Sequence, residues 1–380
     1  MADEQDLFEN APPVGVERRL GLVRPNSRNV GRRALLLVSI GWAPLLLLAI
    51  AESALAGSDE ITPMLREVGL HARYLVAVPL LVLAENVCAP RLNDIVRQFV
   101  VGGVVRKSEV GRLDEAVAST RRLLDSTGAE IVVVALAYAF VGAAMISHPL
   151  DQAPAWVKGG VASRYSLAGW WHLLVSVPLL LVLIFGWLWR LALWARLLAL
   201  ISRFDLRLVA SHPDHCAGLG FLGQSLRAFA IVALALAVIV AGRSAHLVLA
   251  GDELYFNAGV LVAIALLFIA PLFVFSPKLS STWRRGAFEY GAIAGEVGGA
   301  FEQKWLKDHE DDRAILDQPD FSATTDLYSV ASNVFSMRFL PLDLRDLIAL
   351  AVALLAPFAP VILLAFPLEV IWKRLISLFF

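Results

Sequence analysis

The stretch WWHLLVSVPLLLVLIFGWLWR, residues 170–190, contains no Asp, Glu, Lys or Arg before its last residue. A helix of about 20 residues spans the hydrocarbon core of a bilayer, which is about 30 Å thick. Lipid offers the backbone no hydrogen-bond partners, so a single apolar segment satisfies its own polar groups by forming a helix. The stretch therefore predicts a transmembrane helix, and Pro178 within it predicts a kink.

Similar apolar runs recur along the chain. Of its 380 residues, 58% are hydrophobic and 18% are charged, whereas a soluble domain has roughly a quarter of its residues charged. The sequence therefore predicts an all-α, polytopic helical membrane protein with about seven transmembrane helices, some of them proline-kinked. The predicted spans are residues 34–55, 69–89, 129–147, 170–190, 226–249, 257–276 and 346–367.

Lys and Arg are concentrated in alternate connections between these runs, which predicts that the N-terminus and those connections are cytoplasmic. The last run contains Pro357 and Pro360, so it is either one kinked span or a hairpin, and the side of the C-terminus stays open. The predicted organisation is a disordered cytoplasmic segment at 1–30, a six-span bundle at 31–277 with an amphipathic cytoplasmic loop at 90–128, a cytoplasmic helical segment at 278–345, and a membrane helix with its tail at 346–380.

The segment SHPDHCAGLGFLGQS, residues 211–225, combines several motifs. Its G-x-G-x-x-G spacing would bind a dinucleotide only inside a βαβ unit, and its HPD would suit a J-domain only before a charged helix. Here an apolar span follows, so a tight turn is favoured. Pro213 ends the preceding helix and Asp214 caps the next one. The predicted turn and capping residues are His212, Pro213, Asp214, Gly218 and Gly220.

Potential metal ligands occur in two places. In the same segment a metal site remains an alternative, with His212, Asp214, His215 and Cys216 as ligands. The four histidines at the predicted outer ends of the spans are a second candidate, because His commonly binds metals and haem iron. Polar His also suits a membrane interface, so the cofactor stays open. These outer residues are His71, His148, His172 and His246.

Few ionisable residues enter the predicted spans. Glu85 and Arg227 do so near the cytoplasmic side, and we expect them to form an ion pair. A charge at the bilayer centre costs about 2.5–3.5 kcal/mol on insertion scales and usually marks a functional site. Its absence from the middles of the predicted spans argues against a pump with a proton or ion relay there.

Four segments of the second half carry a resemblance to known proteins: HPDHCAGLGFL (212–222), FEQKW (301–305), DFSATTDLYSVASNVFSMRFLPLD (320–343) and PFAPVILLAFPLEVIWKRLISLFF (357–380). They resemble a family of uncharacterised bacterial multi-pass inner-membrane proteins. In that family we expect H-P-D-x-x-G-G-L-G-F-L before a span and a Pro-rich closing helix; here Ala217 stands in place of the first glycine. The resemblance implies a bacterial inner-membrane location and a shared fold, but no activity.

The favoured function is a channel-like or passive transport role. One alternative is a membrane scaffold or sensor that binds a protein partner through its cytoplasmic helices, and another is a metal- or haem-binding membrane protein. No P-loop, H-E-x-x-H motif or nucleophile–base set is visible, which argues against an enzyme. The expected partners are the lipid bilayer and further copies of the chain, and the net charge of −1 gives no reason to expect nucleic acid.

Overall fold

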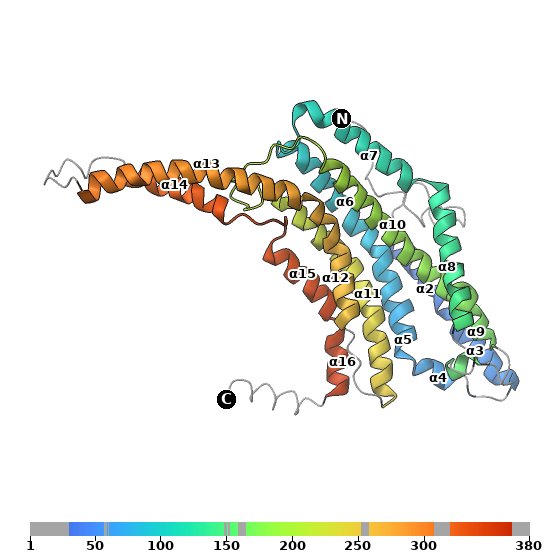
Figure 1. Cartoon of the computed structure of the whole chain (residues 1–380). Coiled ribbons are helices and arrows are strands. Elements are labelled where there is room, and N and C mark those ends of the chain that lie inside the picture. The colour runs from blue at the N-terminus through green and yellow to red at the C-terminus, as the bar shows by residue number, and fades with distance from the viewer. Residues whose placement is uncertain are drawn as a thin grey trace.

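Long apolar helices form a tilted bundle from which one helical hairpin projects (Figure 1). The computed structural model describes residues 30–56, 59, 61–147, 150, 153–158, 165–251, 258–307 and 320–366. Every regular element in these ranges is a helix, which confirms the predicted all-α fold. Nearly all of the segment predicted to be disordered (1–30), the tail after residue 366 and His148 lie outside the described residues.

Within these ranges six helices are long and apolar enough to cross a membrane, and a bent pair near residue 366 could supply a seventh span. The pair, Leu344–Leu355 and Phe358–Ala365, is bent by 48°. The protein thus has the helices of an integral membrane protein, in the order that the apolar runs predicted. The six are Val30–Leu55, Val68–Val101, Thr127–Ser147, Leu167–Ile201, Gly220–Leu249 and Ala258–Leu306.

Several spans contain more than one helical element, and short helices join them. The first four spans and their connections comprise α2 (Val30–Gly41), α3 (Ala43–Ala56), α4 (Ile61–Leu65), α5 (Val68–His71), η1 (Ala72–Ala77), α6 (Val78–Val101), η2 (Lys107–Glu109), α7 (Val110–Leu124), α8 (Thr127–Ser147), η4 (Ala155–Val157), α9 (Leu167–Trp171), η5 (His172–Ser176) and α10 (Val177–Ile201). The remainder comprises η6 (Gly220–Gly223), α11 (Gln224–Leu249), α12 (Ala258–Ile269), η7 (Ala270–Phe275), α13 (Ser276–Glu302), η8 (Gln303–Lys307), α14 (Asp320–Phe335), α15 (Leu344–Leu355) and α16 (Phe358–Ala365).

The helix α11 lies at the centre of the bundle and packs against α5, α6, α15 and α16. It is rich in alanine, which lets neighbouring helices approach closely. At Gly242 the approach is closest, because an added Cβ would lie 2.5 Å from the Cβ of Ala72 on η1. Other helices expose apolar side chains outward, including Leu136 and Phe140 of α8. Exposed apolar surface of this kind fits contact with lipid.

Prolines explain the irregular turns within the spans. In the second and fourth spans a π-helical turn, η1 or η5, comes directly before Val-Pro. Proline has no amide hydrogen and its ring clashes with the carbonyl four residues earlier, so a wider turn relieves the clash. In the first span the helix breaks at Trp42, two residues before Pro44.

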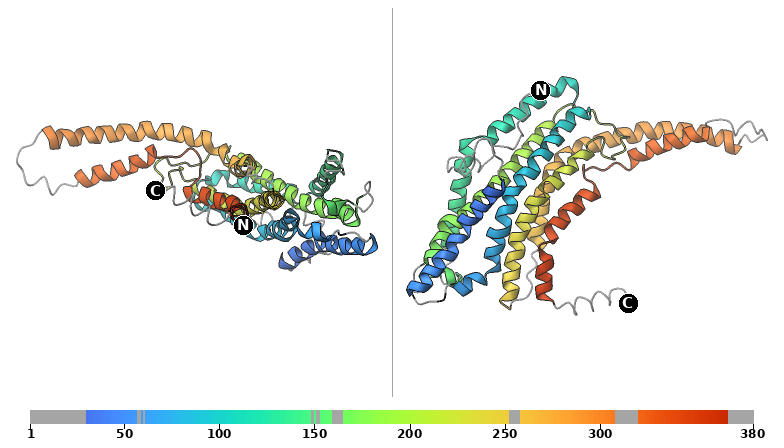
Figure 2. Two further views of the ribbon diagram at one scale, coloured as in Figure 1. Left: turned by 90° about the horizontal axis from the view of Figure 1, so that it is seen from below. Right: turned by 180° about the vertical axis from the view of Figure 1, so that it is seen from behind.

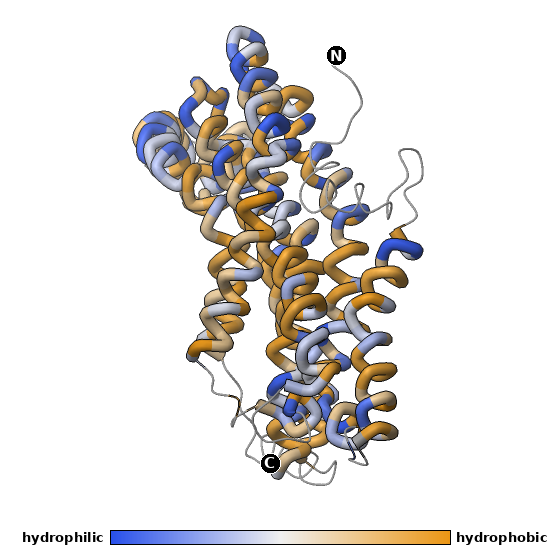
Figure 3. The backbone as a smooth tube through the Cα atoms, turned by 90° about the vertical axis from the view of Figure 1, so that its right-hand side faces the viewer, coloured by the Kyte–Doolittle hydropathy of each residue, from blue (hydrophilic) through white to orange (hydrophobic). Residues whose placement is uncertain are grey.

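The hairpin of α13, η8 and α14, called the arm below, leaves one end of the bundle and points away from it (Figures 1 and 2). We call this the arm end and the opposite one the far end. Near the tip of the arm, the ring of Phe321 lies 4.8 Å from that of Phe301 and 4.6 Å from that of Trp305. Apolar residues dominate the length of the bundle, whereas hydrophilic ones are more frequent towards its ends (Figure 3).

Candidate functional site

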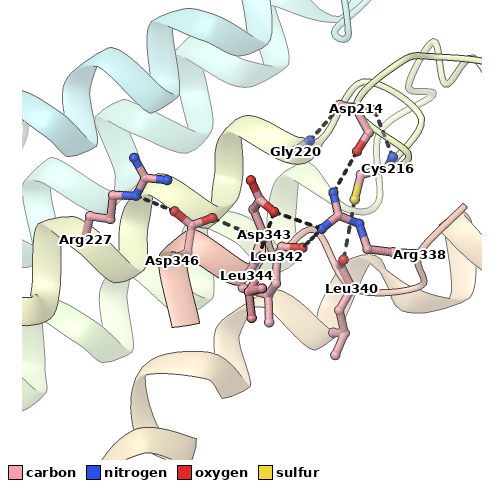
Figure 4. A network of polar contacts seen from close by, with 10 residues as sticks. All are labelled: Asp214, Cys216, Gly220, Arg227, Arg338, Leu340, Leu342, Asp343, Leu344 and Asp346. Atoms are coloured by element: carbon pink, nitrogen blue, oxygen red, sulfur yellow. Dashed lines mark hydrogen bonds and ion pairs between the residues drawn. The ribbon is translucent and has the colours of Figure 1, made fainter. Parts of the chain in front are cut away.

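The carboxylate of Asp214 organises the loop that joins the fourth span to the fifth. Its Oδ1 accepts hydrogen bonds from the amides of Cys216 at 2.8 Å and Gly218 at 3.1 Å, and its Oδ2 accepts one from the amide of Gly220 at 2.8 Å. Nδ1 of His212 lies 2.8 Å from Oδ1. Asp214 therefore holds the loop closed around itself and also bonds the first amide of η6, which leads into α11 (Figure 4).

These hydrogen bonds change the acidity of Asp214. Partial burial alone would raise the pKa of its carboxyl, but the amides of Cys216, Gly220 and Gly218 stabilise the carboxylate and hold the pKa below its ordinary value. The same loop contains strained backbone, since His215 and Ala217 both have φ of 54°. Non-glycine residues rarely adopt positive φ, and such conformations persist where the surrounding contacts impose them.

Each glycine of the G-x-G-x-x-G pattern meets a structural need. Gly218 has φ of 92°, which favours glycine. A Cβ on Gly220 would lie 3.0 Å from Oδ2 of Asp214. A Cβ on Gly223 would lie 2.1 Å from Oδ2 of Asp346, so this carboxylate occupies the space that a side chain would fill.

Arg338 joins this loop to the segment that returns from the arm. Its backbone amide donates to the carbonyl of His215 at 2.7 Å, and its Nη2 donates to the carbonyl of Asp214 at 2.9 Å. Its Nη1 donates to the carbonyl of Leu342 at 2.6 Å. The base of the arm and the loop before α11 therefore form one connected structure (Figure 4).

The proposed metal ligands of this loop have other roles. Burial raises the pKa of the Cys216 thiol to about 11, and its Sγ lies 3.5 Å from the carbonyl of Leu340 as a donor. Metals bind the thiolate, which this environment disfavours. Asp214 is occupied by backbone amides, as described above. Within the described ranges no group of three or more His, Cys, Asp or Glu side chains could hold a metal ion.

Glu85 pairs with arginines of two other spans and not with Arg227. Its two carboxylate oxygens accept from Nη1 of Arg33 at 2.6 Å and from Nη2 of Arg190 at 2.7 Å. Arg190 is almost fully buried and also lies over the ring of Trp187, 4.7 Å from its centroid. The predicted Glu85–Arg227 pair is wrong: α6 packs against α2, α10 and α11, but Glu85 bonds Arg33 of α2 and Arg190 of α10, and Arg227 of α11 bonds a different carboxylate.

Arg227 instead pairs with a carboxylate at the start of the bent pair. Its Nε lies 2.6 Å from Oδ1 of Asp346, whose side chain is 3% exposed. Asp346 also belongs to a capping box, in which its Oδ2 accepts from the amide of Asp343 while Asp343 caps α15. The pair therefore fixes the first turn of α15 against the first turn of α11 (Figure 4).

The predicted outer histidines do not form a shared site within the described residues. His71 uses both ring nitrogens, Nδ1 with the indole of Trp42 at 3.0 Å and Nε2 with the carbonyl of Leu65 at 3.0 Å. His172 is buried, with Nδ1 3.4 Å from the hydroxyl of Tyr74. His246 lies in the last turn of α11. His148, the fourth, lies outside the described residues.

A cleft of about 700 Å³ opens beside the Asp214 loop. Four segments line it, namely the turn after α6, the loop before α11, the first turn of α11 and the segment that returns from the arm. It is our candidate functional site, because cavities of about 300–1,000 Å³ with a few placed polar groups are typical of ligand sites. Its charged wall residues are Arg207, His212, Asp214, Arg227, Arg338, Asp343 and Asp346, together with His215.

Sequence reasoning missed Arg338 and Asp346 as parts of this site. The spacing of Asp343 and Asp346 before an apolar run was a usable signal for a capped helix start. No local pattern relates Arg338 to Asp214, which lies 124 residues earlier. Comparison of the chain with protein-family models, with curated proteins and with solved structures finds no match. The resemblance to a bacterial membrane family therefore stays a prediction.

Proposed function

We propose that the protein is a membrane-embedded scaffold or sensor that binds a helix of a partner protein through its arm. In this proposal the arm end faces the cytoplasm of a bacterial cell and the membrane is the inner one. The Lys- and Arg-rich connections support this orientation, because the arm and α7 both belong to them. The observation that carries the proposal is a face of α13 that no other described residue covers.

That face has the shape of a helix-docking surface. Phe288 is 79% exposed and stands at one end of a ridge of small residues that continues through Ala292, Gly295 and Gly299. The spacing of these four positions places them on one side of the helix. A Cβ on Gly295 or Gly299 would meet nothing within 4 Å, so a partner backbone has room to approach.

The rest of the arm holds α13 so that its ridge faces outward, towards a partner protein. The other side of α13 is covered by α14, where Gly291 and Gly298 meet Phe335 and Tyr328. Charged residues border the ridge, including Arg285 and Glu296, as at the rim of a protein interface. A transport role remains a prediction. It would need a polar path through the bundle, whereas Glu85, which lies within the second span, is paired with Arg33 and Arg190.

Photo-cross-linking tests the proposal. A benzophenone amino acid replaces Phe288 in the full chain, expressed in a bacterial inner membrane. The matched control is Phe273, which lies on the same long helix and is 50% exposed among the spans. We expect a discrete protein adduct from position 288 only, lost in the Gly295→Leu variant because the ridge is blocked. An adduct of twice the chain mass would identify the partner as a second copy.

Adducts with lipid alone at both positions would contradict the proposal, because they would show that the ridge lies on the bilayer. A protein adduct that survives Gly295→Leu would also contradict it, since the ridge would then not be the docking surface.

A further inference from the structure

The cleft beside the Asp214 loop has polar groups that have no partner in the part of the chain that the structure describes. We propose that it binds a phosphate-bearing anion, with Arg207 and Arg227 as the principal ligand-binding residues. This inference goes beyond the proposed function and does not depend on what the arm binds. The argument starts from the acidic groups, because three carboxylates and three arginines line the same cleft.

The carboxylates face partners of their own. Both oxygens of Asp214 accept backbone amides of its loop. Asp346 is 3% exposed and is paired with Arg227 and the amide of Asp343. Asp343 accepts from the amide of Leu344 at 2.7 Å and lies 3.4 Å from Nη1 of Arg338. Their negative charge is therefore largely compensated before any ligand enters.

The basic groups are used less completely. Arg207 is exposed, and its guanidinium has no partner among the described residues, while its backbone amide is fixed on the carbonyl of Val104 at 2.8 Å. Arg227 is 44% exposed and only its Nε is engaged within the described part of the chain. Guanidinium groups suit phosphate, because their planar donors match its oxygens in pairs.

Neighbouring groups add to this donor set. Nδ1 of His212 faces Asp214, which leaves Nε2 as a further polar atom of the wall. The amides of Gln98 and Gln224 belong to the same lining and are exposed. Arg227 and Gln224 lie in the first turn of α11, a 26-residue helix whose positive dipole end favours an anion.

The cleft has room for a ligand larger than inorganic phosphate. About 700 Å³ accommodates a phosphate together with an organic group. Two sources share this chemistry: an anionic phospholipid headgroup, since Arg227 lies where a span begins, and a water-soluble phosphate compound. A soluble probe, pyrophosphate, tests for the second source, and a lipid probe, phosphatidylglycerol, tests for the first.

The test uses the purified full chain in phosphatidylcholine nanodiscs. Binding of inorganic pyrophosphate to the nanodisc sample is measured by calorimetric titration. In a second sample, purified in detergent, native mass spectrometry counts the phosphatidylglycerol molecules that stay bound to the protein. The variants are Arg207→Gln and the Arg207→Gln/Arg227→Gln double variant. The matched control is Arg97→Gln/Arg203→Gln, which removes the same charge at exposed positions outside the cleft.

We expect wild type and control to bind alike, and Arg207→Gln to weaken binding by about tenfold or more, as for a lost charged hydrogen bond. A loss seen with pyrophosphate assigns a soluble phosphate compound, and a loss seen only with phosphatidylglycerol assigns the headgroup. Arg207→Gln removes no described side-chain contact, so its melting temperature should match wild type. Equal binding by cleft and control variants, or no binding of either probe by wild type, would overturn the proposal.

Discussion

Tyr138 donates its hydroxyl hydrogen to the backbone carbonyl of Leu174 at 3.1 Å, and Leu174 lies four residues before Pro178. A proline has no amide hydrogen, so the carbonyl four residues earlier loses its helical partner. The indole of Trp171 bonds the carbonyl of Ile40 at 3.1 Å in the same relationship to Pro44. Side chains of neighbouring helices thus satisfy the carbonyls that two prolines release, as a bilayer requires.

Replacing Tyr138 by Phe should therefore destabilise the bundle only while Pro178 is present. We expect a loss of about 0.6 kcal/mol in the free energy of unfolding, the average for hydrogen bonds between membrane helices, and at most about 1.7 kcal/mol. In a Pro178→Ala background the new amide bonds Leu174 itself, and Tyr138→Phe should then have almost no effect. The measurement is a double-mutant cycle by detergent unfolding. Equal losses in both backgrounds would show that Tyr138 acts through packing alone.

A methyl group at position 223 should be poorly tolerated. In Gly223→Ala the new Cβ would lie 2.1 Å from Oδ2 of Asp346, a buried carboxylate that is held on both sides. We expect a loss of about 3 kcal/mol, at the upper end for overpacked sites. Gly111→Ala on α7 is the control, because its Cβ meets nothing within 4 Å. It should leave stability unchanged or raise it by about 0.5 kcal/mol. Similar melting temperatures for the two variants would contradict this view of the α11–α15 contact.

The stabilising effect of the Asp214 charge should depend on pH. Its folded-state pKa lies below the ordinary value because three amides stabilise the carboxylate against the opposing effect of burial. The stabilisation is therefore fully present above the unfolded pKa of about 4 and disappears as the pH falls through the folded pKa. Asp214→Asn should lower stability by about 1 kcal/mol at neutral pH. The difference in melting temperature between the two proteins should shrink as the pH falls below about 4. A difference that is constant from pH 3 to pH 7 would contradict the role of the charge.

Removing the charge of Glu85 should be far more damaging than removing an exposed acidic charge. Glu85→Gln leaves Arg33 and Arg190, both buried, without their shared carboxylate. Loss of one partner from a buried ion pair destabilises by about 3–5 kcal/mol. The control is Asp205→Asn, which breaks the exposed pair with Arg106 and should change stability by about 0–1 kcal/mol. If Glu85→Gln and Asp205→Asn lowered the free energy of unfolding by the same amount, the buried cluster would not be a stabilising unit.

The spans were predictable from the sequence because each apolar run must satisfy its own backbone hydrogen bonds in lipid. A run such as 170–190 must be helical in lipid whatever surrounds it. The irregularities were predictable in kind, since Pro178 requires a disturbed turn. Their partners were not, because Tyr138 reaches Leu174 only through the relative placement of two helices.

The ion pairs show the same limit more sharply. Both Glu85 and Arg227 were identified from their rarity within apolar runs, but each bonds a different residue from the one expected. The rotation of α6 and the position of α15 decide these pairs. Asp346 was overlooked because it begins an apolar run, where it was counted as the edge of a span and not as the partner of Arg227.

The bond from Arg338 to the carbonyl of Asp214 joins residues 124 positions apart. At a synthesis rate of about 5–20 residues per second, Asp214 is synthesised about 6–25 s before Arg338. During that interval the amides of the loop can bond Asp214, but the bonds that Arg338 makes at the base of the arm do not yet exist. A nascent chain stalled before residue 338 should consequently show an inserted bundle whose 211–223 loop is more accessible to protease than in the finished protein.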